Sequence, residues 1–174
     1  SKLVGTDIND RTYAKKTLSM MKPQISETLT SKSTGAQVII FTHPIIDTEK
    51  AELVGFLGSA VYANSMGNYF NNMKVNGTKS SFGYLVDEKG NVVYHPKKEK
   101  IGKPVEVTDI KKVMDKVQKG EIIESAVIKY KDGKVDKVEC YTQIPRTKWI
   151  LVLSGDVAEI QAPVKTIFSF IILI

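Results

Sequence analysis

Cysteine, histidine and tryptophan are scarce in this sequence of 174 residues, which has one cysteine, two histidines and one tryptophan. A single cysteine, Cys140, allows no intrachain disulfide and no C-x-x-C motif, which excludes zinc-finger and thioredoxin-like chemistry. Val138 and Tyr141 lie close to it in the sequence, and a cysteine among apolar residues is most often a small buried side chain. We therefore expect Cys140 to be a buried structural residue.

Patterns of catalytic and metal-binding residues are also missing. His43 and His95 each precede a proline at the end of an apolar run, and neither shows H-x-x-x-H or H-x-H spacing, so structural roles are expected for both. No serine lies in a G-x-S-x-G context, and no glycine loop has the pattern of a phosphate site. We predict a protein that is not an enzyme and that needs no cofactor or metal.

The composition indicates a folded chain with a basic surface. Hydrophobic residues make up 42% of the chain and charged residues 25%, and the net charge is +6. The first two values are ordinary for globular proteins. The lysines fall on expected turns and helix faces without interleaved aromatic residues, so nucleic-acid binding is not expected.

The two ends of the sequence differ in character. Residues 1–10 have no basic-then-apolar signal segment. Residues 167–174 are nearly all apolar, and as a helix they would extend about 12 Å against the ~30 Å that a membrane span requires. Two interpretations are open: a terminal segment that packs on a core, or the first turns of a truncated transmembrane helix.

Residues 1–61 contain one predicted helix and two predicted strands. Acidic residues precede the helix expected at 10–20, as the helix dipole favours. Apolar runs predict strands at 37–43, ended by Pro44, and at 53–61. Three elements are too few for an independent core of this size.

The predicted strand at 53–61 leads into a predicted connection. Gly55 and Gly58 are placed to allow close packing of this strand. From Tyr62 to Lys74, apolar residues follow helical spacing, which predicts a connecting helix.

Residues 82–102 predict a β-hairpin whose second strand has a clear end. Apolar and aromatic residues alternate in the first strand, turn residues at 87–91 reverse the chain, and a second apolar run follows. His95 and Pro96 end the second strand, because proline has no N–H for the ladder.

One helix and three further strands are predicted after the hairpin. The helix at 109–118 carries apolar residues at i, i+3, i+4 and i+7. The strands are expected at 122–130, 134–144 and 149–154, before a final helix from Asp156. The fold class is therefore α+β, with a PAS-like, five-stranded antiparallel sheet over residues 82–155 and a helical excursion after the second strand.

Several short motifs occur in a fixed order along the chain. They are Asp10-Arg11-Thr12-Tyr13, Ser31-Lys32-Ser33-Thr34-Gly35, Pro44-Ile45-Ile46-Asp47, Val54-Gly55-Phe56-Leu57-Gly58, the hairpin at 82–102, and Tyr141-Thr142-Gln143-Ile144-Pro145 with Trp149. Together they resemble the double Cache (dCache) family, the PAS-like extracytoplasmic sensor domains of bacterial methyl-accepting chemotaxis receptors and sensor kinases. The resemblance covers roughly residues 7–174.

The resemblance implies a tandem arrangement of two PAS-like Cache modules, the first of them incomplete in this chain. The expected parts are the second half of a membrane-distal module at 1–61, a connecting helix at 62–78, a membrane-proximal module at 79–155, and a C-terminal helix at 156–174 that leads into a truncated transmembrane segment.

Arg11 and Tyr13 are the best ligand-binding candidates. An arginine fork suits a carboxylate bidentately, and an aromatic wall shields a small ligand from water. The resemblance supports this role, because amino-acid-binding double Cache domains hold the ligand carboxylate with an arginine in this segment. The alternative is that Arg11 pairs with Asp7 or Asp10 while Tyr13 packs in the core. The other residues expected in the same pocket are Ser31, Thr42, His43 and Ser59.

Three positions depart from the pattern of the amino-acid-binding members. Ala14 stands where a second aromatic residue is usual, and Ser31 and Ala60 stand where aspartates hold the ligand amine. Without those carboxylates, a buried ammonium group would be poorly compensated. We therefore expect a plain carboxylate or another small polar ligand.

Four residues of the second predicted module, Tyr84, His95, Tyr130 and Tyr141, could face a second cavity. Aromatic side chains on strands belong to the core far more often than to a ligand site. No ligand site is predicted there.

The resemblance implies a receptor that recognises a small-molecule ligand, an organic acid or amino acid, and signals across the cell membrane. The expected partners are that ligand, the membrane through the C-terminal helix, and a second copy of the chain in a homodimer. Two alternatives stay open. The chain could be the sensor of a histidine kinase or cyclic-dinucleotide enzyme, or a free-standing binding module whose apolar end is core.

Overall fold

The computed structural model describes residues 4–70, 72–75, 77–145 and 147–163. The chain divides into two compact units, Ser1–Ala63 (unit 1) and Asn64–Ile174 (unit 2). The elements of unit 1 are α1 (Thr12–Met20), β1 (Gln24–Ile25), β2 (Leu29–Thr30), β3 (Gln37–Asp47) and β4 (Glu52–Tyr62), with the 3₁₀ turn η1 (Ala63–Met66) beginning at its end. The elements of unit 2 are α2 (Gly67–Phe70), β5 (Phe82–Val86), β6 (Val92–Tyr94), η2 (Lys98–Lys100), α3 (Thr108–Gln118), β7 (Ala126–Asp132), β8 (Val135–Gln143) and β9 (Ile150–Asp156).

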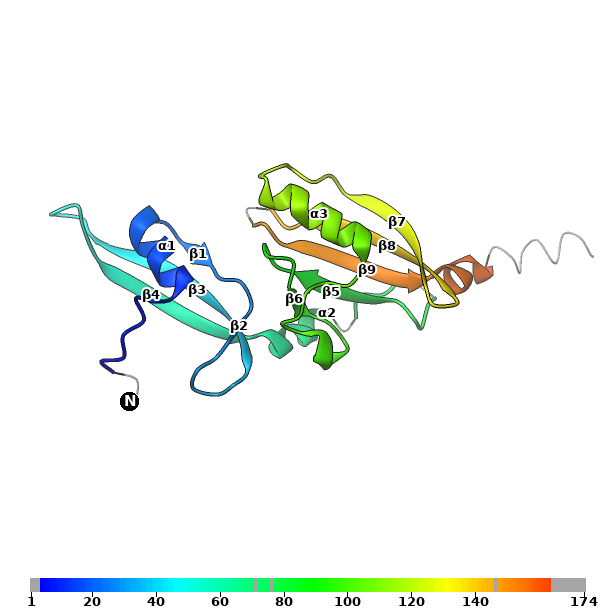
Figure 1. The fold of residues 1–174 in the computed structure, drawn as a ribbon, viewed down its shortest axis with the longest axis horizontal. Helices are drawn as coiled ribbons and strands as arrows, with labels where there is room; N and C mark the ends of the chain where they lie inside the picture. Colours follow the sequence, from blue (N-terminus) through cyan, green and yellow to red (C-terminus); the bar gives the residue numbers. More distant parts are fainter. Residues whose placement is uncertain (1–3, 71, 76, 146, 164–174) are drawn as a thin grey trace, which may run out of the picture. The chain divides into compact units, whose positions relative to one another are not determined.

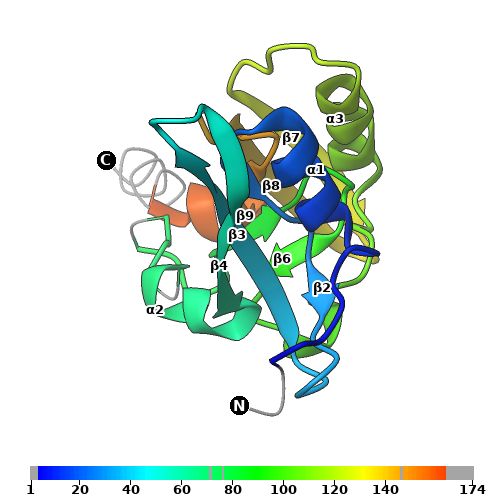
Figure 2. The same ribbon diagram turned by 90° about the vertical axis from the view of Figure 1, so that its left-hand side faces the viewer.

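Unit 1 is a long β-hairpin with one helix on it. β3 and β4 pair antiparallel, and the short strands β1 and β2 pair with the other edge of β3. Helix α1 packs on β3 and β4 (Figures 1 and 2). It buries Ala14 and Thr17 and ends at Met21, whose left-handed backbone donates its N–H to the Thr17 carbonyl. The predicted helix is confirmed.

The predicted end of the first strand at Pro44 is wrong. β3 continues through Pro44 to Asp47, and Pro44 lies opposite Phe56 of β4. β1 reaches only to Gln24, opposite Thr42, so beyond Thr42 the strand β3 is a sheet edge on that side. Proline is tolerated at an edge because its missing N–H breaks no ladder there.

Two further expectations for the chain around β4 are wrong. A Cβ on Gly55 would meet nothing within 4 Å, and one on Gly58 would meet only the Phe56 ring at 3.7 Å, so neither glycine is required by close packing. The connecting helix predicted to Lys74 is reduced to η1 and the single turn α2, which ends at Phe70. Asparagine, serine and glycine in this segment disfavour a longer helix.

Unit 2 is a five-stranded antiparallel sheet with the strand order β6-β5-β9-β8-β7. α3 lies along one face of it (Figure 1) and buries its apolar side against the sheet. The helix residues in this core are Ile110, Val113, Met114 and Val117. The predicted PAS-like sheet, the hairpin and the amphipathic helix are confirmed, as is the end of β6 before His95.

Cys140 is exposed, so the expected burial of its side chain is wrong. Successive side chains of a strand point to opposite faces. Glu139 is buried on β8 and Tyr141 packs against the core. Cys140 stands between them and is therefore directed to the outer face of the sheet.

The C-terminal helix begins directly after β9, and residues 157–163 are helical. The Glu159 carboxylate accepts the backbone N–H groups of Lys79 and Ser80, each at 2.8 Å. A hydrogen bond from the Ser80 side chain, followed by these backbone bonds, lowers the pKa of Glu159 to about 2. The contacts attach the helix to the segment that precedes β5. The apolar residues 167–174, predicted as the start of a transmembrane segment, lie outside the described residues. Within the described ranges, no helix has the length and hydropathy of a membrane span.

Candidate functional site

Three of the predicted ligand residues come together in unit 1. Arg11, Tyr13 and Ser31 line one cavity of about 120 Å³ on the sheet face that carries α1. Tyr13 also forms a wall of a neighbouring open groove, where its ring meets Phe56 edge-on at 6.4 Å. The side chains that complete the cavity are Leu29, Thr30, Lys32, Val38, Ile40 and Ala60.

The charge of this cavity is positive. Arg11 and Lys32 line it, and no acidic side chain of the described residues does so. Lys32 pairs with Asp10 at 3.2 Å, and this hydrogen bond is the largest cause of the lowered pKa of Asp10. Arg11 lies farther away, with its Nε 3.9 Å from Asp10 Oδ1 and 23% of its side chain exposed. The contact with Asp10 is long and involves only Nε, so the other N–H groups of the Arg11 guanidinium can donate to an anion.

Thr42 has a structural role on the same sheet face. Its hydroxyl is buried, lies 2.5 Å from the Thr17 hydroxyl and contacts the Gln24 carbonyl at 3.4 Å. These bonds join α1, β1 and β3. Thr42 therefore supports the element that carries Tyr13 and does not line the cavity.

His43 and Ser59 are not brought to this cavity. Thr42 and Ala60 face α1 and the cavity, and each neighbours one of these two residues in its strand, so alternation directs His43 and Ser59 to the opposite sheet face. Both are exposed, and His43 Nδ1 donates to the Pro44 carbonyl at 2.9 Å.

A second cavity, of about 110 Å³, lies in unit 2. One sheet face carries a row of paired residues, Phe82, Ser154 and Glu139, on β5, β9 and β8. The apolar part of this face is covered by α3, whereas the polar part faces the cavity beneath the segment that runs from His95 to Val107. The sequence predicted no ligand site here.

Glu139 is the most unusual residue of this cavity. It is 1% exposed, and its two carboxylate oxygens accept the hydroxyls of Tyr84 at 2.9 Å and Tyr130 at 3.0 Å. Burial raises the pKa of Glu139, and the hydrogen bonds from the tyrosines and Ser154 act in the opposite direction. Burial and the neighbouring carboxylate also raise the pKa of both tyrosines, which stay protonated as donors.

His95 closes the other side of the cavity. Its ring lies 5.0 Å from that of Phe82 and 5.6 Å from that of Tyr84, and its Nδ1 accepts the Lys97 N–H at 2.9 Å. Burial, followed by the charges of Lys100 and Lys97, lowers the pKa of His95 to about 4. The ring is therefore neutral near pH 7, with its proton on Nε2.

The burial of His95 predicts a loss of stability in acid. Its pKa of about 4 in the folded chain lies below the ordinary 6.5, so the unfolded chain binds the proton first as the pH falls through this window. We expect the His95 titration to lower the free energy of unfolding by about 3 kcal/mol as the pH falls from 6.5 to 4, and to lower it no further in stronger acid. Urea unfolding at about pH 7 and about pH 4.5 measures this loss.

His95→Gln is the comparison that isolates this effect. Other groups titrate in the same window, and the raised pKa of Glu139 gives the opposite trend, because the folded state then takes up the proton first. The variant retains those contributions. It should lose less stability than the wild type on acidification, and equal losses would refute the assignment to His95.

The position of Glu139 could have been recognised from strand alternation alone. Tyr141 was assigned to the core side of its strand, and Glu139 is two residues earlier, hence on the same face. A carboxylate on the inner face of a strand needs a partner. The sequence did not indicate which partner, because Tyr84 is 55 residues away.

The five-stranded antiparallel sheet of unit 2, covered on one face by α3, has a PAS-like architecture. The Cache domain model (dCache_1) matches residues 4–164. The chain therefore belongs to the double Cache family of sensor domains, as the order of its motifs predicted.

Solved structures with the same fold are sensor regions of receptors. The ligand-binding domain of the Pseudomonas aeruginosa PAO1 amino acid chemoreceptor PctB, in complex with L-Arg, has a TM-score of 0.68 and 14% identity over 95% of this chain and 62% of its own. The ligand-binding domain of the Pseudomonas fluorescens chemoreceptor CtaA, in complex with L-alanine, has a TM-score of 0.65 and 18% identity over 90% of this chain and 64% of its own. The extracellular domain of a protein described as a histidine kinase, mmHK1S-Z3, has a TM-score of 0.75 and 17% identity over 95% of this chain and 63% of its own.

These likenesses establish the fold. The chain spans 57% to 64% of the length of the solved structures it matches. No curated protein matches it.

Proposed function

We propose that this chain is the extracytoplasmic ligand-sensing region of a bacterial transmembrane chemoreceptor, and that it binds a small carboxylate in the cavity of unit 1. The carrying observation is the position of Arg11 beside Tyr13 and Ser31, with its guanidinium only loosely paired. The Cache family and the chemoreceptor structures with this fold support a role in recognition without catalysis.

The charge of the unit 1 cavity favours an anion over a zwitterion. Arg11 offers a planar fork that fits a carboxylate bidentately, whereas the charge of Lys32, which also lines the cavity, is compensated by Asp10. Ser31 and Ala60 both line the cavity, and neither can compensate an ammonium group. An amino acid would therefore place its amine without a counter-charge, which is costly on burial.

The proposal also assigns a path for the signal. In this proposal the segments at 1–61 and 79–155 are the membrane-distal and membrane-proximal modules, 62–78 connects them, and 156–174 leads to the membrane. A ligand shifts a conformational equilibrium only by its differential affinity for the two states, and couplings of about 1–3 kcal/mol are typical. The full receptor acts as a homodimer.

The test is a thermal-shift screen of organic acids and amino acids, followed by titration of the best stabilising compound. Arg11→Ala should weaken binding of that carboxylate by about 100-fold, since two charge-assisted hydrogen bonds are removed. Lys15→Ala, an exposed substitution on the same helix, is the matched control and should bind as the wild type does. Undiminished binding to Arg11→Ala would refute the site.

A sensor histidine kinase is the second candidate. The extracellular domains of two proteins described as histidine kinases share this fold over at least 90% of the chain. The two candidates share the same recognition step and differ in the domain beyond the membrane. The gene sequence that follows residue 174 distinguishes them, because it encodes either a methyl-accepting signalling domain or a kinase.

A further inference from the structure

The cavity of unit 2 contains a buried carboxylate that is satisfied only by neutral groups. Among the described residues, the side chains that hydrogen-bond the Glu139 carboxylate are Tyr84, Tyr130 and Ser154, and all three are hydroxyls. The charge of Lys137, on the same strand, acts on Glu139 only as the weakest of the influences that lower its pKa, because Lys137 is ion-paired with Asp156. A carboxylate that is withdrawn from water without a cation is costly. This end of the cavity therefore has a deficit of positive charge.

The oxygen atoms at this end match the donors of a primary ammonium group. Both tyrosine hydroxyls donate to Glu139, so the Tyr84 oxygen keeps its lone pairs and the Tyr130 oxygen, which Ser154 also bonds, keeps one. The carboxylate itself can accept about four hydrogen bonds. Three acceptor oxygens, two phenolic and one carboxylate, are thus gathered for three N–H donors. The rings of Phe82, Tyr84 and Tyr130 also line the cavity, and aromatic faces attract cations.

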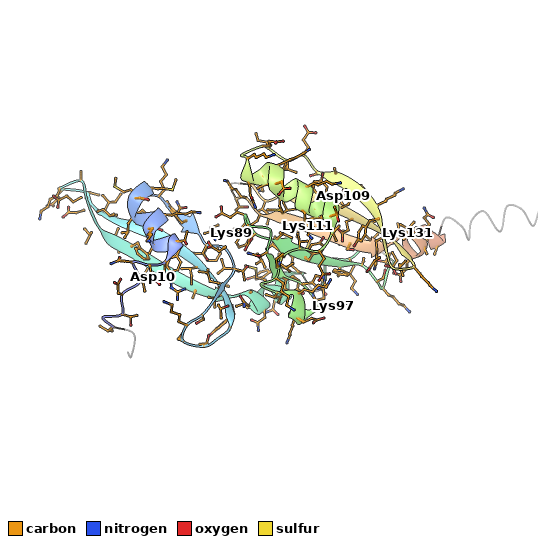
Figure 3. The ribbon with its side chains drawn as sticks, viewed as in Figure 1. Asp10, Lys89, Lys97, Asp109, Lys111 and Lys131 are labelled. Atoms are coloured by element: carbon orange, nitrogen blue, oxygen red, sulfur yellow. The ribbon has the colours of Figure 1, made fainter. Side chains whose placement is uncertain are left out.

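The segment on the other side of the cavity has the opposite charge. Lys97 and Lys103 line it, and neither forms an ion pair within the described part of the chain. Lys100 also lines it but is paired with Glu106 at 2.8 Å. His95 adds an Nε2–H donor, because its Nδ1 accepts the Lys97 N–H. Figure 3 shows Lys97 on the segment that follows β6.

We propose that the unit 2 cavity is a second ligand site, which takes a small zwitterion. Its primary ammonium group binds Glu139 and the two tyrosine oxygens, and its anionic group lies toward Lys97, Lys103 and His95. The cavity, at about 110 Å³, suits a short aliphatic amino acid. The two cavities thus select different chemistry: unit 1 lacks an acid and takes a plain anion, whereas unit 2 has charges of both signs.

The experiment is isothermal titration of the chain with three probes, glycine, β-alanine and γ-aminobutyrate, which carry the same two charges at increasing separation. At least one should bind. Ethylamine and propionate carry one charge each, and on the Arg11→Ala variant, which lacks the carboxylate site of unit 1, both should bind at least about tenfold more weakly than the best of the three. Failure of all three probes would overturn the proposal. Equal binding of ethylamine would overturn the role of the lysine side.

Variants assign the binding to the unit 2 cavity. Glu139→Gln keeps an acceptor for a tyrosine hydroxyl but removes the charge, and it should weaken the best probe by at least about tenfold. Tyr130→Phe keeps the ring and removes one acceptor oxygen, so it serves if Glu139→Gln fails to fold, and it should weaken the probe by several-fold. Circular dichroism checks the fold of each variant.

The unit 1 site provides the independent control. Arg11→Ala should leave binding of the zwitterion unchanged, and Glu139→Gln should leave binding of the plain carboxylate unchanged. If Arg11→Ala abolishes zwitterion binding while Glu139→Gln retains it, the probe occupies unit 1 and the second site is refuted. If the wild-type chain binds the zwitterion but no plain carboxylate, the proposed function is refuted and the second site is not.

Discussion

Replacing Asp87 with alanine is expected to lower the free energy of unfolding of unit 2 by about 3 kcal/mol. Asp87 is 0% exposed, and its Oδ1 accepts the N–H groups of Lys89 and Asn91 at 2.9 Å each. The carboxylate thereby holds the turn between β5 and β6, in which Gly90 takes a positive φ of 83°. Each bond to a charged acceptor contributes about 1.5 kcal/mol or more, and alanine leaves both donors without their acceptor.

Asp87→Asn is the matched control for this prediction. The amide keeps an oxygen in the place of Oδ1 and has nearly the same volume, so we expect a loss of about 1 kcal/mol, well below that of alanine. Urea unfolding, followed by circular dichroism, measures both variants. If alanine and asparagine cost the same, the turn does not depend on the acceptor.

Truncation of Ile150 to alanine is expected to cost about 3 kcal/mol. Ile150 is 0% exposed on the central strand β9 and belongs to the core that the apolar side of α3 covers. The cost combines the lost burial of the removed carbon atoms with the cavity left between sheet and helix, because a packed core relaxes only in part. The same unfolding experiment measures it.

Val127 provides the control for Ile150. It lies on β7 of the same sheet but is 61% exposed, so Val127→Ala should change the free energy of unfolding by less than about 0.5 kcal/mol. If the two truncations have similar effects, β9 is not the centre of the core. A larger effect at Ile150 with an unchanged urea slope would place the change in the folded state.

The architecture of unit 2 could be predicted because its signals are local. Alternation along β5, β8 and β9, the turn between β5 and β6, and the apolar stripe of α3 each lie within one short window of sequence. The two-residue strands β1 and β2 give no such window, and they were not predicted. The connecting helix was predicted too long, because the prediction relied on the helical spacing of apolar residues and gave too little weight to the poor helix formers between Asn64 and Asn68.

The two cavities differ in how far the sequence could indicate them. Arg11 and Tyr13 are two residues apart, and Ser31 was assigned to the same pocket through its motif. The sequence could therefore predict that these three residues line one cavity. Glu139, in contrast, depends on tyrosines from β5 and β7. That arrangement is set by the order of strands in the sheet, which no local pattern encodes. The opposite orientation of His43 and Ser59 likewise follows from register, not from residue type.

The junction of β9 with the C-terminal helix has a mechanical consequence. β9 ends at Asp156 and the helix begins at the next residue, so strand and helix are connected in series without a compliant spacer. We therefore expect a shift of β9 to move the start of the helix with it. Asp156 itself holds Lys137 at the wall of the unit 2 cavity, and Glu159 resists rotation through its two backbone hydrogen bonds. The end of β9 and the first turns of the helix are thus anchored to unit 2 by the chain itself, by the Asp156–Lys137 ion pair and by the Glu159 bonds.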